Sequence, residues 1–317
     1  MYGSDGQHEA WRLYLRNWIP LALMAQLLVF CVAVSDFSLQ IDSLFCQVVL
    51  TAASFAVAGR YLISSQRATR LAVVLLSGAQ LQVLLLLGTP LSYVAASANL
   101  PLQDATFAYY DQLLGLDWRA YYDFVMHRPA LIPYAYIGYA MIGLLPIVIP
   151  IILGLTRCYA RLQNFTMACI LSVCATAVIS AILPAIGTYQ QYSLPAESLN
   201  FSASGYLVQI RELPIVRDGS LRSLYITHLG GIVTFPSFHA AAAILDMWAL
   251  WSVWWMRPFE LIANVGMLLA TPLIGGHYFV DVFAGVGIAA LAIATAKMLK
   301  GRSELFVAQA APVVVTA

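Results

Sequence analysis

The chain has 317 residues, of which 61% are hydrophobic and only 10% are charged, and its formal net charge is +1. A soluble domain cannot bury that much apolar surface, and repeated runs of about 20 apolar residues indicate membrane-spanning helices. The composition therefore predicts an integral membrane protein surrounded by membrane lipids, and we expect no nucleic-acid partner.

The apolar runs are eight in number and follow one another along the chain. They cover residues 18–35, 43–63, 71–96, 130–155, 165–186, 237–256, 259–275 and 277–297. No repeat or low-complexity linker separates them. The predicted fold is all-α: a polytopic membrane bundle of about eight transmembrane helices. We expect residues 1–17 to form a cytoplasmic or interfacial N-terminus, 18–298 a single membrane domain, and 299–317 a cytoplasmic tail.

Basic residues beside the runs predict the orientation of the chain, because cytoplasmic loops carry an excess of lysine and arginine. With a cytoplasmic N-terminus, eleven of the sixteen lysines and arginines lie on the inner side. An even number of spans then places both termini in the cytoplasm. The other five arginines lie in two long outer loops: Arg119, Arg128, Arg211, Arg217 and Arg222. Either these arginines bind an anionic substrate, or the long loops cross the membrane regardless of the charges that they carry.

The segment of residues 275–281 has the sequence Gly-Gly-His-Tyr-Phe-Val-Asp. Its His277 and Asp281 are spaced i and i+4, so they share a helix face. Asp281 can accept a hydrogen bond from one ring nitrogen of His277 and raise the basicity of the other. A histidine oriented in this way is suited to act as a nucleophile.

The segment of residues 234–239 has the sequence Thr-Phe-Pro-Ser-Phe-His and opens another apolar run. Pro236 suits the first position of a helix, which would leave the backbone N–H groups near Ser237 and Phe238 free to bind an anion such as phosphate. His239 would then lie beside that anion. The predicted topology places both histidine segments on the outer side.

Alone, the spacing of His277 and Asp281 is a weak signal, since it recurs by chance on helices. The alternatives for His277 are a packed interfacial histidine and a metal ligand. The second histidine segment on the same side favours catalysis. A metal site would need further ligands at recognisable spacing, and the other outer histidines are only His127 and His228. We therefore expect neither a metal nor a cofactor.

The two segments resemble the Pro-Ser-x-His and His-x-x-x-Asp motifs of the type 2 phosphatidic acid phosphatase superfamily. They are similar in particular to those of its inositol-phosphorylceramide synthase branch. Supporting similarity extends to residues 187–192 and 217–219, and more loosely to residues 111–129. The resemblance implies a six-helix core, about residues 71–298, and a phosphohistidine formed on His277. It also implies that His239 protonates the leaving oxygen.

The chain departs from the superfamily pattern in its arginines. Thr271 stands where the third motif has an arginine, and Tyr121 stands where the first motif has a lysine before Arg128. Phosphoryl transfer needs positive groups around the phosphate, so other residues must supply them. Arg217 and Arg222 are the best candidates, and Arg128 is a weaker one. The alternative for each is a solvated loop charge.

These residues predict an enzyme that acts on a lipid phosphate ester at the extracytoplasmic face and transfers the phosphoryl or phospho-head group to a hydroxyl acceptor. With water as the acceptor it would be a lipid phosphatase. An alternative from another class is a non-catalytic lipid binder or transporter, but the intact set of His239, His277 and Asp281 argues against it. The lack of dibasic tail signals and glycan-rich loops suits a bacterial inner membrane.

Several aspartates remain outside these motifs. Asp246 lies seven residues after His239, about 10 Å deeper in the same helix, where an ionisable residue is costly. It either binds an acceptor hydroxyl or hydrogen-bonds to a neighbouring helix. The spacing of the outer aspartates predicts an interfacial helix with an acidic edge, and calcium binding there would have poor ligand spacing. These are Asp104, Asp111, Asp117 and Asp123.

Overall fold

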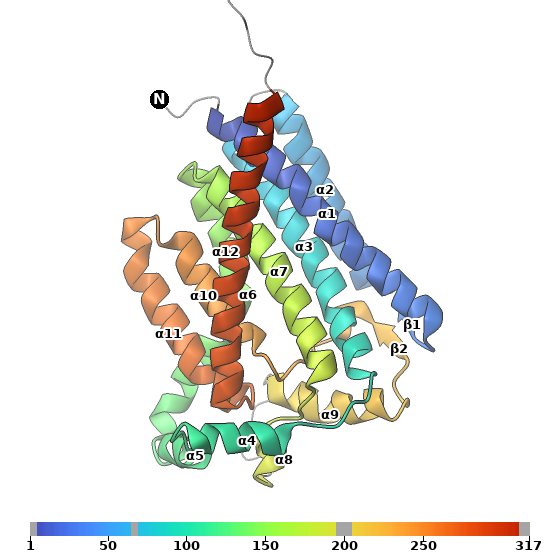
Figure 1. Ribbon diagram of the computed structural model, residues 1–317, viewed down its shortest axis with the longest axis vertical. Coiled ribbons are helices and arrows are strands. Elements are labelled where there is room, and N and C mark those ends of the chain that lie inside the picture. The colour runs from blue at the N-terminus through green and yellow to red at the C-terminus, as the bar shows by residue number, and fades with distance from the viewer. Residues whose placement is uncertain (1–4, 65–68, 195–204, 311–317) are drawn as a thin grey trace, which may run out of the picture.

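The computed structural model describes residues 5–64, 69–194 and 205–310, and helices dominate these ranges. The long helices run side by side as a bundle (Figure 1). They are α1 (Asp5–Val34), α2 (Ser43–Ser64), α3 (Thr69–Ala96), α6 (Ile132–Leu155), α7 (Tyr159–Ile182), α10 (Phe238–Leu250), α11 (Arg257–Ile274) and α12 (Phe279–Ala310). The predicted all-α membrane bundle is confirmed.

Each predicted apolar run forms a helix, but the helices differ in their ability to cross a membrane. Among the described residues, α1, α2, α3, α7 and α12 are long and apolar enough, and Pro129–Leu144 with Pro146–Leu155, bent by 57°, make a sixth if the pair is counted as one span. The predicted run 237–256 is interrupted, because α10 ends at Leu250. Its 13 residues make about 20 Å of helix, shorter than the roughly 30 Å of a hydrocarbon core. That α10 and α11 cross the membrane thus stays a prediction.

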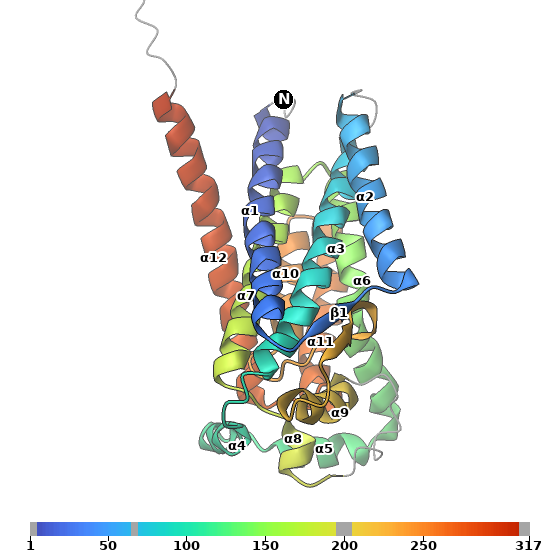
Figure 2. The ribbon, with the colours of Figure 1, turned by 90° about the vertical axis from the view of Figure 1, so that its right-hand side faces the viewer.

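Shorter elements lie across one end of the bundle (Figures 1 and 2). They are α4 (Asp104–Leu113), α5 (Trp118–Met126), α8 (Thr188–Gln191) and α9 (Gly205–Arg217). Beside them, β1 (Ser38–Gln40) pairs in parallel with β2 (Ser223–Tyr225). This pairing ties the connection between α1 and α2 to the segment that leads into α10. Single 3₁₀ turns occupy Pro129–Leu131, Ile226–His228 and Trp254–Met256.

The centre of the bundle is built from α3, α6, α7, α10, α11 and α12. Helix α12 packs against α7 and α10, and α11 packs against α6 and α10. A side chain at Gly138 would meet the backbone of Gly266 at 2.8 Å, so α6 and α11 approach each other backbone to backbone. Small residues permit such close packing where no water is present to drive association.

Helix α1 attaches to this core through polar side chains. The amide of Asn17 donates to the side-chain oxygen of Gln163 at 3.1 Å, and the amide of Gln163 donates to the Ser77 hydroxyl at 2.8 Å. All three residues are buried. Since unsatisfied polar groups are costly inside a membrane, this network fixes α1 against α3 and α7 in one register.

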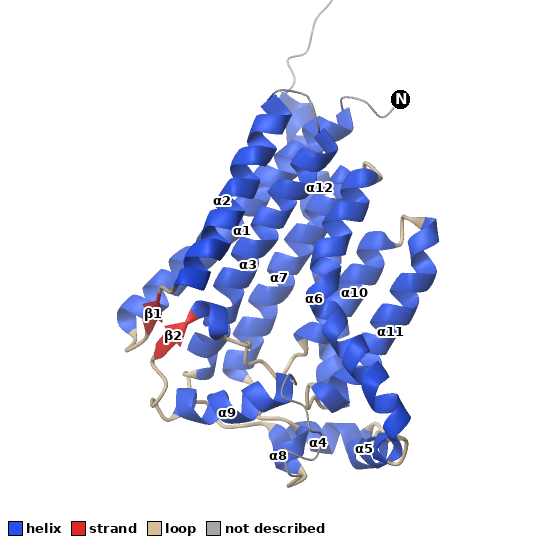
Figure 3. Cartoon of the chain, turned by 180° about the vertical axis from the view of Figure 1, so that it is seen from behind, coloured by secondary structure: helices blue, strands red, loops and turns tan. Residues whose placement is uncertain are grey.

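The start of α1 and the end of α12 lie at the same end of the bundle, and the short helices cover the opposite end (Figures 1 and 3). Both described ends of the chain therefore emerge together. The first turns of α10 and α12 lie at the end covered by the short helices, and these turns carry the two histidine segments.

Candidate active site

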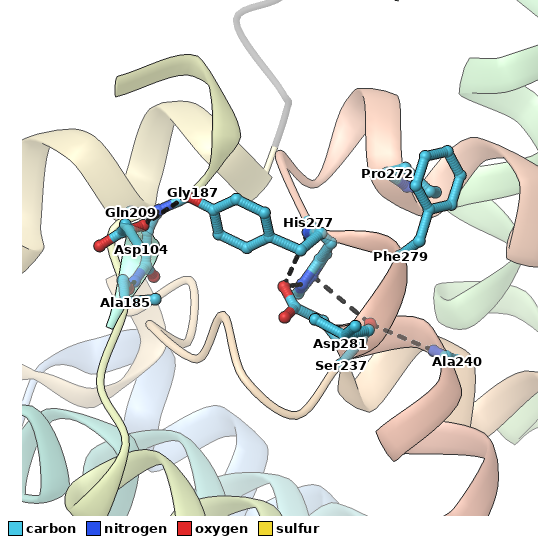
Figure 4. A network of polar contacts seen from close by, with 12 residues as sticks. Asp104, Ala185, Gly187, Gln209, Ser237, Ala240, Pro272, His277, Phe279 and Asp281 are labelled. Carbon is cyan, nitrogen blue, oxygen red and sulfur yellow. Dashed lines mark hydrogen bonds and ion pairs between the residues drawn. The ribbon is translucent and has the colours of Figure 1, made fainter. Parts of the chain in front are cut away.

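His277 and Asp281 form a buried pair at the start of α12 (Figure 4). Nδ1 of His277 lies 3.2 Å from Oδ2 of Asp281. The same oxygen accepts a hydrogen bond of 2.9 Å from the backbone N–H of Tyr278. His277 is 4% exposed and Asp281 is fully buried. The carboxylate thus caps the helix and orients the ring, and it leaves Nε2 available for chemistry.

Nε2 of His277 faces the first turn of α10, 3.5 Å from the Ser237 hydroxyl oxygen. Ser237 is the N-cap of α10, because its hydroxyl accepts the N–H of Ala240 at 3.3 Å. Its own N–H donates to the Asp281 carbonyl at 3.0 Å. These contacts correct two predictions: Pro236 precedes the cap instead of opening the helix, and the Ser237 N–H is not free.

The next two N–H groups of α10 remain open. In the described part of the chain, the backbone N–H groups of Phe238 and His239 have no hydrogen-bond partner. They occupy the first helical positions, where no preceding turn supplies a carbonyl. The positive end of the helix dipole adds to their attraction for an anion. The unbonded N–H groups are thus those of Phe238 and His239, one residue on from the predicted Ser237 and Phe238, and anion binding there stays a prediction.

His239 lies on the first turn of α10, and its ring stacks on Tyr139 of α6. The ring centroids are 3.9 Å apart and the planes differ by 15°. No hydrogen bond joins the rings of His239 and His277 in the described part of the chain; the two segments meet through the contacts of Ser237 with His277 and Asp281. The stacked tyrosine restricts the imidazole to one plane, which suits a group that must deliver a proton along one direction.

Helices α10 and α12 touch where they carry the two histidines. A side chain at Gly285, one turn beyond Asp281, would overlap the Ser237 carbonyl oxygen and crowd Ala240. The absence of a Cβ at Gly285 therefore allows the first turn of α10 to lie against α12. This contact sets how closely the first turn of α10 approaches α12.

The loop before His277 is held by the segment that contains α8. Thr188 N–H donates to the Gly276 carbonyl at 2.9 Å, and a Cβ on Gly187 would approach the same carbonyl to 2.7 Å. Gly276 has φ 65°, which favours glycine. The Tyr189 hydroxyl donates to the Leu273 carbonyl at 2.7 Å. Residues 187–192 thus position the His277 loop from outside the bundle.

Two of the three candidate arginines make contacts with main-chain carbonyls away from this site. Arg222 donates to the Val216 carbonyl at 2.7 Å and lies over the Phe37 ring at 4.7 Å. Arg128 donates to the Phe124 carbonyl at 3.0 Å. In the described part of the chain, none of these contacts links either guanidinium to the histidines.

Arg217 is linked to the site through the charge of Asp104. Its Nη2 donates to the Leu100 carbonyl at 2.8 Å, whereas its buried Nη1 has no partner among the described residues. Burial lowers the pKa of Arg217, and the nearby Asp104 carboxylate opposes this effect. Asp104 in turn accepts a hydrogen bond from the hydroxyl of Tyr278, the neighbour of His277. Thr271 is buried and supplies no charge.

The predicted acidic edge of residues 104–123 is not a solvent-facing edge. Asp104 and Asp111 are 7% and 0% exposed and point from α4 into the protein. Asp111 accepts the N–H groups of Phe279 and Val280 at 2.8 and 2.9 Å. Asp104 accepts the N–H of Gly187 at 2.8 Å. Their spacing of seven residues is two helical turns, the signal by which the pair could have been recognised.

The remaining aspartates of that segment have local partners. Asp117 caps α5, and Asp123 pairs with Arg119 at 3.1 Å on the surface. The described residues contain no group of three or more His, Cys, Asp or Glu arranged to hold a metal ion.

Asp246 is buried in α10 on the side away from solvent. Its Oδ2 has no hydrogen-bond partner in the part of the chain that the structure describes. Glu260 of α11, which bonds to Asn264 at 2.8 Å, acts on it electrostatically. Neither predicted role for Asp246 is tested by these contacts.

Comparison with known proteins agrees with this geometry. The model of the PAP2 superfamily matches residues 105–295, more than half of the chain, and this range includes both histidine segments. No curated protein and no solved structure matches the chain. The chain therefore belongs to the PAP2 superfamily and is an integral membrane enzyme of the phosphatase type that acts on lipid phosphates.

Proposed function

We propose that the protein is a lipid phosphotransferase similar to the inositol-phosphorylceramide synthases. It moves a phosphoryl or phospho-head group from one lipid to a hydroxyl acceptor through a phosphohistidine. The observation that carries this proposal is the buried His277–Asp281 pair, whose Nε2 lies 3.5 Å from the hydroxyl of Ser237, the residue just before the open N–H groups of α10.

In the proposed reaction, Nε2 of His277 attacks phosphorus while Asp281 holds Nδ1–H. The bond to the leaving lipid oxygen breaks, and His239 supplies the proton to that oxygen. The acceptor hydroxyl then attacks the phosphohistidine and gives its proton to His239, which restores both rings. The N–H groups of Phe238 and His239 bear the charge on the equatorial oxygens, and Ser237 holds them in place by capping α10.

Arg217 is the arginine that we propose for the phosphate or head group. We expect Arg217→Gln to raise KM for phosphatidic acid in mixed micelles about tenfold, because a charged hydrogen bond contributes about 1.5–3 kcal/mol. Arg222→Gln is the matched control. It should keep KM and lower the melting temperature instead, since Arg222 caps α9 and stacks on Phe37. A wild-type KM for Arg217→Gln would contradict the assignment. Arg128 stays the weaker candidate.

The acceptor is tested with phosphatidylinositol that carries a radiolabelled phosphate, given to the purified protein in vesicles with and without ceramide. We expect label on the protein in an acid-labile form and then on the lipid alcohol. Release of label only to water would make the enzyme a phosphatase. An unlabelled protein without turnover would contradict the proposed mechanism and favour a lipid binder.

We further propose that the end of the bundle covered by α4, α5, α8 and α9 faces the extracytoplasmic side of a bacterial inner membrane. The support is the bias of basic residues: eleven of sixteen belong to the side of the termini. Both described ends of the chain emerge at the end of the bundle opposite to α4, α5, α8 and α9 (Figure 1).

A further inference from the structure

Helix α4 lies across the end of the bundle and directs one carboxylate at the start of α12. Both oxygens of Asp111 are engaged: Oδ2 accepts Phe279 N–H at 2.8 Å and Oδ1 accepts Val280 N–H at 2.9 Å. The preceding N–H, of Tyr278, is bound by Asp281. Three consecutive N–H groups directly after His277 are therefore bound by carboxylates.

The N-termini of α10, which carries His239, and of α12, which follows His277, thus differ in whether their backbone N–H groups are bonded. In the part of the chain that the structure describes, α10 presents the unbonded N–H groups of Phe238 and His239. At α12 the equivalent donors are filled. An open helix N-terminus binds anions, so without Asp111 the start of α12 would attract phosphate two residues beyond the nucleophile. A filled one leaves α10 as the anion site.

We propose that Asp111 is a positioning residue for His277. It fixes the first turn of α12, and hence the His277 ring, and it closes that turn to the substrate phosphate. The inference rests on the proposed role of His277 as nucleophile. Asp111 binds backbone N–H groups at the start of α12, so it acts on His277 through that backbone.

A second carboxylate on the same helix supports the same loop. Asp104, two turns earlier on α4, accepts the Tyr278 hydroxyl and the Gly187 N–H at 2.9 and 2.8 Å. Figure 4 shows Asp104 and Gly187 on the side of the loop opposite Asp281. The His277 loop is therefore held from α4 at two points as well as from its own helix.

Keeping the Asp111 carboxylate ionised in a buried position costs free energy, which argues that the charge has a function. Burial raises the pKa of Asp111, and the two N–H donors only partly offset this effect. A neutral side chain would avoid the desolvation of a charge. Only an ionised carboxylate, however, accepts both N–H groups with both of its oxygens.

The test is Asp111→Asn, which keeps the shape of the side chain but leaves one acceptor oxygen for two donors. Using phosphatidic acid in mixed micelles, we expect kcat to fall about tenfold while KM is unchanged, as for partners that orient a functional histidine. Asp111→Glu, which retains two acceptors, should recover part of the loss. Asp123→Asn, on the neighbouring helix α5, is the control, because the Asp123 side chain is 44% exposed and its ion pair is with Arg119 on the surface.

Melting temperature in detergent is measured for each variant. A lower melting temperature with wild-type kcat per folded molecule would show a purely structural role and overturn the proposal. Wild-type kcat and KM, or a change in KM alone, would overturn it as well. Different results would contradict the two proposals. An active His277→Ala protein would contradict the role of His277 as nucleophile. An inactive His277→Ala protein together with a fully active Asp111→Asn protein would contradict only the positioning role of Asp111.

Discussion

Replacing His277 with alanine is expected to lower the rate of phosphoryl transfer by at least about 10⁴-fold, because it removes the proposed nucleophile. The oriented Nε2 has no substitute at the start of α12: Asp281 is fully buried and binds Nδ1 and the Tyr278 N–H. The rate is measured as release or transfer of labelled phosphate. The acid-labile phosphoprotein should disappear together with turnover.

His228→Ala is the matched control for this change. His228 lies on the same end of the protein in an exposed segment, 3.6 Å from Asp42. We expect this variant to keep the wild-type rate and the phosphoprotein. A His277→Ala protein that folds and still transfers phosphate at the wild-type rate would refute the enzymatic mechanism proposed for this site.

The histidine pair was predictable because its geometry is local. The contact was expected from spacing, but not by the predicted shared helix face: His277 lies in the loop before α12, and Asp281 reaches back to it from the first turn of that helix. The long helices were predictable for a similar reason, since uninterrupted apolar runs specify spans without reference to their neighbours. Resemblance in the same short segments identified the superfamily, which the match over residues 105–295 confirms.

The contacts that sequence did not predict join distant parts of the chain. The N–H of Ser237 meets the carbonyl of Asp281, and Asp111 meets Phe279 across 168 positions. Such pairs depend on how α4, α10 and α12 pack, which no local spacing encodes. The contacts of the candidate arginines were not predictable for the same reason. Arg217 and Arg222 are similar in sequence context, yet Arg217 feels the charge of Asp104 and Arg222 lies over the Phe37 ring.

Gly285 carries the second large prediction, since it determines how closely the two histidine helices approach. We expect Gly285→Ala to lower kcat about 100-fold, because the new methyl group overlaps the Ser237 carbonyl and must push α10 away from α12. His239 and the open N–H groups of α10 would move with it, away from His277. Overpacking should also destabilise the protein by about 1–3 kcal/mol, measurable as a lower melting temperature.

Gly287→Ala separates this effect from a general intolerance of α12 to alanine. Gly287 is on the same helix, two residues further along, and a Cβ there has no neighbour within 4 Å. Its replacement should keep kcat and raise stability slightly, since alanine favours helix over glycine by about 0.5–1 kcal/mol. If the two variants behaved alike in kcat, the contact between Gly285 and Ser237 would not govern the geometry of the site. A selective loss at Gly285 would instead mean that catalysis depends on the distance between two backbones as well as on the identity of the two histidines.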